Sequence, residues 1–355
     1  MNRGDHEPIN LGEITLPSGT LVVTDMGYLG SWSGSAPPSH VPDQITDPEL
    51  RANIAAAQDF RLVGPDAEFA ARAVDLQSLT YVYDIPRHGV STIVDRYKEA
   101  IDKHRLDAKF ESEVQRVPHR ERARRAAAAG GADFIIDGVW SVAVGDLPTD
   151  RPMKVTGRRR DYGEGVGPRW SDVTVEIGES QGPSETLIGQ VGVDWARIIL
   201  IDADALRSWV HDTSLDGLAD VAYWGRDISH ARAAFGGNDL EDRTIGWENL
   251  PEADAQDLAV RIEKWRHSPD RRLMVDYRPH SHHYQVMRQI RRGDEFGMGT
   301  IELGGALAVA FHTSWGDGIF PVFRDGSSQQ MDAIRIQLGD EDRRQRTQAL
   351  GLSRS

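Results

Sequence analysis

Two stretches of the sequence resemble each other, SGTLVVTDMGYLGSW at residues 18–32 and WARIILIDADALRSW at residues 195–209, and they decide the expected fold. Aligned without gaps, they place Asp25 on Asp202. In each stretch a β-branched run, typical of a buried strand, leads into the aspartate and then to a tryptophan. The sequence therefore predicts that one strand-to-aspartate unit is used twice.

A second pair of stretches follows in the same order. ADFIIDGVWSVAV at residues 132–144 aligns with GTIELGGALAVAF at residues 299–311 and shares Gly138/Gly305. The two pairs are separated by 177 and 167 residues, so order and spacing are nearly conserved. Matches that recur in the same order indicate a diverged tandem duplication.

The segments between these matches predict helices and strands that do not alternate regularly. This pattern favours an α+β fold with two related, mainly antiparallel β-sheet domains and flanking helices. We expect a first pseudo-repeat at residues 1–160, a linker with a possible strand at 161–186, a second pseudo-repeat at 187–340 and a polar flexible tail at 341–355. A Pro-His pair before each predicted central helix suggests that His119 and His280 are counterparts.

Charge and composition exclude several classes of protein. The 355 residues carry a formal net charge of −14, which disfavours binding to a nucleic-acid backbone. The absence of cysteine excludes disulfides, thiolate metal sites and cysteine nucleophiles. The polar N-terminus and the short apolar runs predict neither a secretory signal nor a membrane span. Arginine accounts for 36 of the 41 basic residues, which is typical of a GC-rich bacterial genome, so we expect a bacterial cytoplasmic protein with no nucleic-acid or membrane partner.

The most distinctive motif is the stretch TSWGDGIFPV at residues 313–322. Glycines and an aspartate between two apolar runs predict a tight hairpin, in which Trp315 and Asp317 serve either the turn itself or a site at its tip. Together with Gly192–Ala196 and the strand ending at Asp202, this motif resembles the bacterial domain-of-unknown-function family 4241. The resemblance implies a fold unit and a bacterial setting but no activity.

A histidine cluster is the best candidate for chemistry. His282 and His283, with His312 before the hairpin and Asp317 within it, could supply ligands to a divalent metal ion. The spacing of two histidines one helical turn apart, found in zinc-dependent hydrolases, is absent. A role in the helix-entry turn or on the surface is the alternative for these imidazoles.

Tryptophans and arginines are candidates for ligand binding. Most tryptophans, including Trp195, lie in strand-like or helix-like contexts and are expected in the core. The segment Tyr223–Asp227 is an exception, because it joins a strand to a helix that Asp227 can cap, and such turns often carry function. We take Trp224, Arg226, Arg278 and Trp315 as candidate ligand-binding residues.

These features lead to two hypotheses from different classes. The first is a binding or interaction protein that holds an unknown small molecule or protein between two related domains and needs no cofactor. The alternative is a metal-dependent hydrolase that uses His282, His283, His312 and Asp317, with Arg278 holding an anion. A sugar-binding module is a third reading, which would need Trp224 and Trp315 to be exposed. No serine elbow or phosphate loop is present in the sequence.

Overall fold

The chain forms two compact units. Unit 1 comprises residues 1–208 and 293–355, and unit 2 comprises residues 209–292. The computed structural model describes residues 7–38, 48–74, 80–85, 89–113, 116–178, 184–240, 243–267, 271–292, 297–327 and 330–349.

The α+β prediction is confirmed, because helices flank sheets in which every described strand pair is antiparallel. Two six-stranded sheets and one three-stranded sheet lie in unit 1, and a four-stranded sheet lies in unit 2. The helices are α1 (Pro48–Ala55), α2 (Ala67–Val74), α3 (Val90–His104), α4 (His119–Ala128), α5 (Ile228–Phe235), α6 (Glu252–Arg266), α7 (His282–Arg292) and α8 (Glu341–Ala349).

The first six-stranded sheet contains both of the aligned stretches. Its strand order is β16 (Met298–Leu303), β17 (Ala306–His312), β11 (Arg197–Asp202), β2 (Leu21–Asp25), β7 (Val139–Val144) and β6 (Ala132–Ile136). At its centre β2 pairs with β11, so that Asp25 lies opposite Ile198 and Asp202 lies opposite Leu21. Three strands of each half of the chain therefore meet at this central pair.

Both outer hairpins of this sheet turn through two residues with positive φ. These are Asp137 and Gly138 between β6 and β7, and Gly304 and Gly305 between β16 and β17. Two consecutive left-handed residues match the twist of antiparallel strands, and Asp-Gly and Gly-Gly adopt this conformation at low cost.

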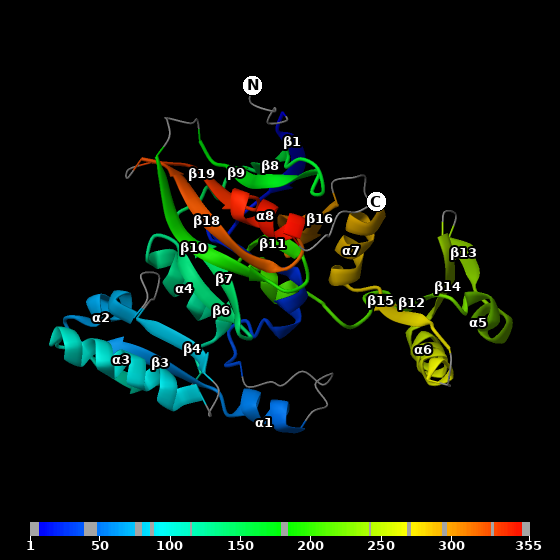
Figure 1. The fold of residues 1–355 in the computed structure, drawn as a ribbon, viewed down its shortest axis with the longest axis horizontal. Coiled ribbons are helices and arrows are strands. Elements are labelled where there is room, and N and C mark those ends of the chain that lie inside the picture. Colours follow the sequence, from blue (N-terminus) through cyan, green and yellow to red (C-terminus); the bar gives the residue numbers. More distant parts are fainter. Residues whose placement is uncertain are drawn as a thin grey trace. The chain divides into compact units, whose positions relative to one another are not determined.

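The second six-stranded sheet lies against the first (Figure 1). Its strand order is β1 (Ile9–Ile14), β8 (Met153–Asp161), β9 (Pro168–Glu176), β19 (Met331–Gln337), β18 (Gly318–Gly326) and β10 (Glu185–Val193). Apolar side chains from the facing sides of both sheets, among them Trp170, Phe320, Val142 and Val309, form one buried core. Burial of this apolar surface is the main stabilising contribution to unit 1.

The edge strands β1 and β10 each contain a glycine at a register shift, Gly12 and Gly189. A Cβ at Gly12 would lie 3.0 Å from Thr300, on the hairpin of the C-terminal half. A Cβ at Gly189 would lie 2.2 Å from Asp133, on the hairpin of the N-terminal half. Each half thus packs its bulged edge strand closely against the other half.

Two smaller sheets share a pattern of β-α-β-α-β. In unit 1, β3 (Gln58–Val63) lies between β4 (Tyr81–Ile85) and β5 (Lys109–Ser112), with α2 and α3 as connections. In unit 2, β12 (Leu218–Trp224) lies between β14 (Arg243–Pro251) and β15 (Met274–Pro279), with β13 (Asn238–Leu240) outside β14. In both sheets the first strand is central and both of its neighbours are antiparallel to it.

The helices α4 and α7 begin at His119 and His282, whereas His280 precedes α7 by two residues. The His119 Nδ1 accepts the N–H of Ser33 at 2.9 Å, and the His282 Nδ1 accepts the N–H of Val210 at 2.9 Å. Each of these N–H groups follows a tryptophan of the aligned stretches, so the imidazoles fix equivalent turns.

The boundaries of the units differ from the expected domain boundaries. Residues 1–160 and 187–340 contribute to the same two sheets, because β2 pairs with β11 in the first sheet and β9 lies between β8 and β19 in the second. The expected linker at 161–186 contains the central strand β9, and its residues 179–183 lie outside the described residues. In the expected tail, residues 341–349 form α8, and residues 350–355 lie outside the described residues.

Candidate functional site

The turn between β12 and α5 is held tightly against the segment before β15. Gly225 has φ +134°, and a Cβ there would lie 2.7 Å from the Arg272 carbonyl oxygen. The Asp227 carboxylate accepts the Arg272 N–H at 2.7 Å and does not cap α5, which corrects the sequence prediction. The turn between β12 and α5 and the segment before β15 therefore pack together as one wall.

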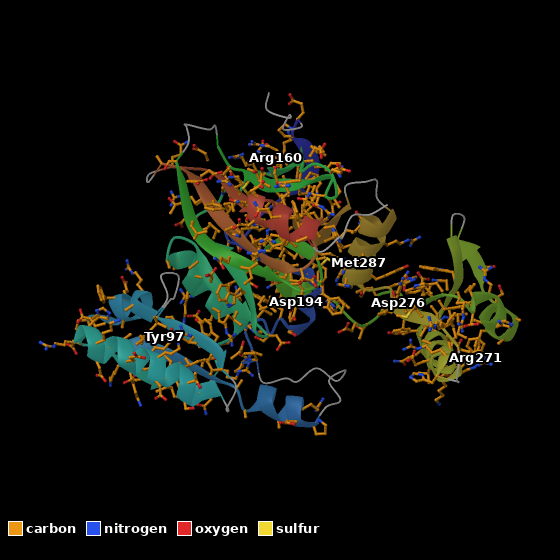
Figure 2. The ribbon with its side chains drawn as sticks, in the orientation of Figure 1. Tyr97, Arg160, Asp194, Arg271, Asp276 and Met287 are labelled. Carbon is orange, nitrogen blue, oxygen red and sulfur yellow. The ribbon has the colours of Figure 1, made fainter. Side chains whose placement is uncertain are left out.

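A pocket of about 520 Å³ opens beside this wall in unit 2. Its side chains come from the turn, from the end of α6 and from the start of β15, and Figure 2 shows Arg271 beside α6. Among the described residues, the lining contains four arginines, one histidine and no acidic residue: Gly225, Arg226, Arg266, His267, Arg271, Arg272, Leu273 and Met274.

The four guanidinium groups differ in their partners. Arg226 is hydrogen-bonded to Asp227 at 3.0 Å, and Arg266 is hydrogen-bonded to Glu263 at 2.6 Å, which raises the pKa of Arg266. Arg271 lies over the Trp265 ring at 3.7 Å, which fixes its orientation by a cation–π contact. Arg272 is exposed, and only its backbone makes hydrogen bonds among the described residues.

The chemistry of this pocket suits an anion. Guanidinium groups present several N–H donors in a plane and bind carboxylates or phosphates in a bidentate manner. Two of the four charges are balanced by neighbouring carboxylates, so the lining retains a net positive charge. Met274, which is 52% exposed, adds an apolar surface beside these donors.

Only one of the four predicted ligand-binding residues lines this pocket. Arg226 does so, whereas Trp224 is the half-buried last residue of β12. Arg278 lies in β15, where its Nε donates to Asp276 at 2.6 Å. Trp315 belongs to unit 1, where its Nε1 donates to the Trp170 carbonyl oxygen at 2.7 Å and holds the 313–318 turn on β9.

Sequence reasoning missed the arginines at positions 266, 271 and 272. Their signal was the run RHSPDRR at residues 266–272, which concentrates cations between a predicted helix and a predicted strand. The pocket forms where Gly225 allows the turn after β12 to approach Arg272 and Leu273, a contact that the sequence does not display.

The predicted histidine cluster is engaged in contacts within unit 2. The His283 ring lies 4.1 Å from the His211 ring, and the Trp209 Nε1 donates to the His211 Nδ1 at 3.0 Å. Burial lowers the pKa of His282, which fits the role of its Nδ1 as an acceptor. These contacts fix the chain on both sides of the helix start.

His280 bridges two carboxylates near this cluster. Its Nδ1 lies 2.9 Å from Asp216 and its Nε2 lies 3.3 Å from Asp220, a buried residue that also accepts a hydrogen bond from Tyr284. Burial alone would lower the pKa of His280, but the hydrogen bonds to both carboxylates outweigh burial and raise it. His280 and Tyr284 therefore hold the buried Asp220 carboxylate through hydrogen bonds.

The other two candidate metal ligands lie in unit 1. The His312 Nδ1 accepts the N–H of Ser314 at 2.9 Å, and Asp317 is an exposed residue of the turn. Within the described ranges, no group of three or more His, Asp or Glu side chains is arranged to hold a metal ion. The metal-dependent hydrolase stays a prediction.

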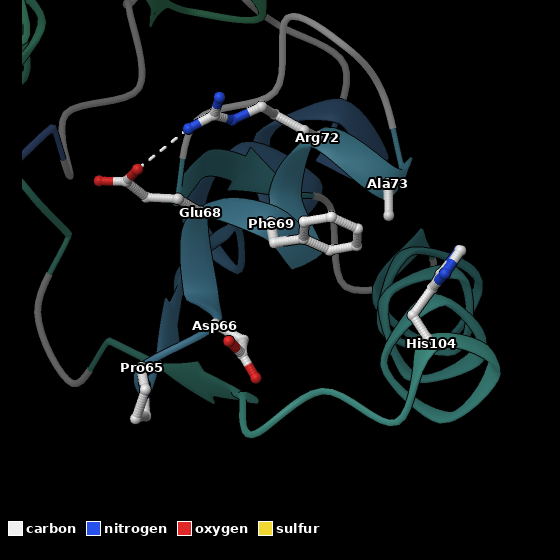
Figure 3. Close-up of a pocket in the computed structure, with 7 residues that line it drawn as sticks. All are labelled: Pro65, Asp66, Glu68, Phe69, Arg72, Ala73 and His104. Atoms are coloured by element: carbon white, nitrogen blue, oxygen red, sulfur yellow. Dashed lines mark hydrogen bonds and ion pairs between the residues drawn. The ribbon is translucent and has the colours of Figure 1, made fainter.

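Two further pockets lie in unit 1. One, of about 550 Å³, lies between α2 and the end of α3, where Figure 3 shows Phe69 and His104 on separate helices and an ion pair between Glu68 and Arg72. The other, of about 500 Å³, lies beside the exposed ion pair of Arg120 with Asp204. Both combine acidic and basic groups, so neither has the uniform charge of the unit 2 pocket.

Comparisons with known proteins identify no relative of this chain. No family model, no curated protein and no solved structure matches the chain. Among the described residues, no helix is both long enough and apolar enough to cross a membrane.

Proposed function

We propose that this chain is a cytoplasmic bacterial binding protein that holds an anionic group of a small molecule or protein in the basic pocket of unit 2. The observation that carries the proposal is the charge of the lining residues that the structure describes, which include four arginines and one histidine but no acid. The proposal places the site in unit 2 instead of between the two halves, because paired strands occupy the junctions between the halves.

The charge of the chain makes this pocket distinctive. Unit 2 has 12 basic and 14 acidic residues, a net charge of −2, which leaves 29 basic and 41 acidic residues, a net charge of −12, in unit 1. In a chain of net charge −14, a concentration of guanidinium groups around one pocket opposes the average field. Ligand binding is a function that explains this local reversal of charge.

Isothermal titration calorimetry with inorganic pyrophosphate tests the proposal. Pyrophosphate is compact and highly charged, and the exposed Arg272 is free to turn toward it. We expect saturable binding that weakens with added salt and about tenfold weaker binding by Arg272→Gln, since a hydrogen bond to a charged group contributes about 1.5–3 kcal/mol.

The matched control is Arg261→Gln. Arg261 lies on α6 over the Phe235 ring and outside the pocket lining, so this variant removes the same charge from unit 2. Equal loss of affinity in both variants, or no binding by the unchanged protein, would contradict an anion site in this pocket.

We also propose that the two halves are copies of one module. The support is reciprocal: the Asp25 carboxylate accepts the N–H of Trp195 at 2.9 Å, and the Asp202 carboxylate accepts the N–H of Ser18 at 2.8 Å. Both pairs are related by the same 177-residue spacing. Membership of family 4241 likewise stays a proposal, supported by the motif at residues 313–322.

A further inference from the structure

Trp195 departs from the expectation that it packs in the core. It lies in the short connection between β10 and β11 of unit 1, and 58% of its surface is exposed. Exposure of a large aromatic side chain forgoes a burial contribution of about 2 kcal/mol or more. Single exposed apolar residues are common, and Trp195 differs from them in how firmly its connection is held.

Three residues, Asp25, Tyr28 and Gly27, hold the Trp195 connection in place. The Asp25 carboxylate, which is fully buried, accepts the N–H groups of Asp194 and Trp195 at 2.7 and 2.9 Å. The Tyr28 hydroxyl donates to the Asp194 carboxylate at 2.8 Å, and Figure 2 shows Asp194 where β10 ends. The indole ring lies directly on Gly27, where a Cβ would be only 2.3 Å from the ring.

The backbone of this connection does not need a tryptophan. The connection before β2 is held in the same way, because the buried Asp202 accepts the N–H of Ser18 there. In both connections the next residue has a positive φ: Gly19 follows Ser18, and Ala196 follows Trp195. At the position of Trp195 that connection has Ser18, whose hydroxyl also donates to Asp202 at 2.7 Å. A small polar residue therefore satisfies this geometry, and the indole serves another purpose.

Acidic groups act on the residues near Trp195: the charge of Asp317 acts on Arg197, and the charge of Asp137 acts on Tyr28. Asp194 and Asp317 are exposed, and Asp137 is half-buried. Burial, and then the hydrogen bond and charge of Asp194, raise the pKa of Tyr28, and the charge of Asp137 adds to this effect. The one cation in this group, Arg197, is half-buried and interacts with Asp25 and Asp317.

We propose that the Trp195 platform, defined as Trp195 with Asp194, Tyr28 and Asp317, is a docking site for an arginine side chain of a partner protein. The exposed part of the indole offers a cation–π surface, for which tryptophan is the best aromatic residue. The neighbouring carboxylates then pair with the guanidinium group, and the net charge of −12 on unit 1 attracts a basic partner. This site is independent of the anion pocket.

The test measures binding of a nine-residue peptide of alternating arginine and glycine by isothermal titration calorimetry. We expect saturable binding to the unchanged protein and none for the matching glutamate peptide. Trp195→Ser, which installs the residue that the other connection already uses, should weaken binding about tenfold without altering net charge or thermal stability.

The control variant is Phe69→Ser, because Phe69 is 56% exposed and lies on α2, outside the platform. Its affinity for the arginine peptide should equal that of the unchanged protein. Asp194→Asn should also weaken binding more than Glu302→Gln, which removes one exposed carboxylate from β16.

Three results would overturn the proposal. They are equal affinity of the unchanged protein and Trp195→Ser, absence of binding by the arginine peptide, and self-association that Trp195→Ser abolishes in sedimentation velocity. The last result would identify the platform as an interface between copies of this chain.

Discussion

The two buried aspartates at the centre of unit 1 should stabilise the fold to a similar extent. In Asp202→Ala, four donors lose their acceptor: the N–H and hydroxyl of Ser18 and the N–H groups of Asp204 and Ala205. At about 1 kcal/mol for each net hydrogen bond, the free energy of unfolding should fall by about 4 kcal/mol. Asp25→Ala leaves three donors without an acceptor and should cost about 3 kcal/mol.

Urea unfolding followed by circular dichroism and by tryptophan fluorescence measures these changes. Asp25 and Asp202 lie four residues apart along the paired strands β2 and β11, about 13 Å at about 3.3 Å per residue. At this separation the two losses should be additive within about 0.5 kcal/mol. The double variant therefore should lose about 7 kcal/mol, a large part of the stability of a typical domain.

Asp204→Ala provides the matched control. Asp204 follows Asp202 by two residues, is exposed and pairs with the exposed Arg120, so its removal should cost less than about 1 kcal/mol. If Asp202→Ala cost no more than Asp204→Ala, the buried carboxylates would not hold the connections, and the reasoning for the Trp195 platform would lose its structural basis.

Three other changes have defined outcomes. Burial and the charge of Arg122 lower the pKa of His119 to about 3, so as pH falls below about 6.5 this histidine takes up a proton in the unfolded state but not in the folded state. The free energy of unfolding should therefore drop by about 2 kcal/mol between pH 7.5 and pH 5. Denaturation curves of His119→Asn should lack this drop. Gly225→Ala should destabilise unit 2 by about 2–3 kcal/mol, because the added Cβ meets the Arg272 carbonyl oxygen and φ is positive. Gly217→Ala, at a position with positive φ but open surroundings, should cost only about 1 kcal/mol. Hydrogen exchange of unit 2 measures both changes. The helix α8 has no buried side chain, and the Arg343 guanidinium group joins it to β18. Arg343→Ala should therefore increase hydrogen exchange throughout α8. Unchanged exchange would mean that other contacts hold the helix.

Local sequence patterns predicted many of the elements. Local signals account for α4, which is rich in alanine, for α6, which buries Leu258 and Ile262 on one face, and for α7, where the Ser281 hydroxyl accepts the N–H of Tyr284, because such signals act within one or two helical turns. The Asp-Gly and Gly-Gly pairs at positions 137–138 and 304–305 are hairpin turns for the same local reason. The strand β9 was harder to predict, since its charged neighbours obscure the alternation of buried residues.

The candidate site was less predictable than the fold. The turn at residues 223–227 was singled out because it joins a strand to a helix, and it does border the basic pocket. The predicted cap by Asp227 was wrong, because its carboxylate bonds to a backbone N–H that is 45 residues away in the chain. Trp195 was expected in the core because its neighbours have strand composition, yet its connection projects the ring outward.

The sequence alone determined the α+β class, the lack of thiol chemistry, the net charge and the matching strand-to-aspartate stretches, since these depend on composition and on periodicities within a few residues. Only the tertiary structure decided that both halves share two sheets, that arginines from three elements surround one pocket, and that an indole stays exposed above a glycine. The physical reason is that strand pairing, close approach at glycines and burial of charge are interactions between distant segments, whose partners local patterns do not specify.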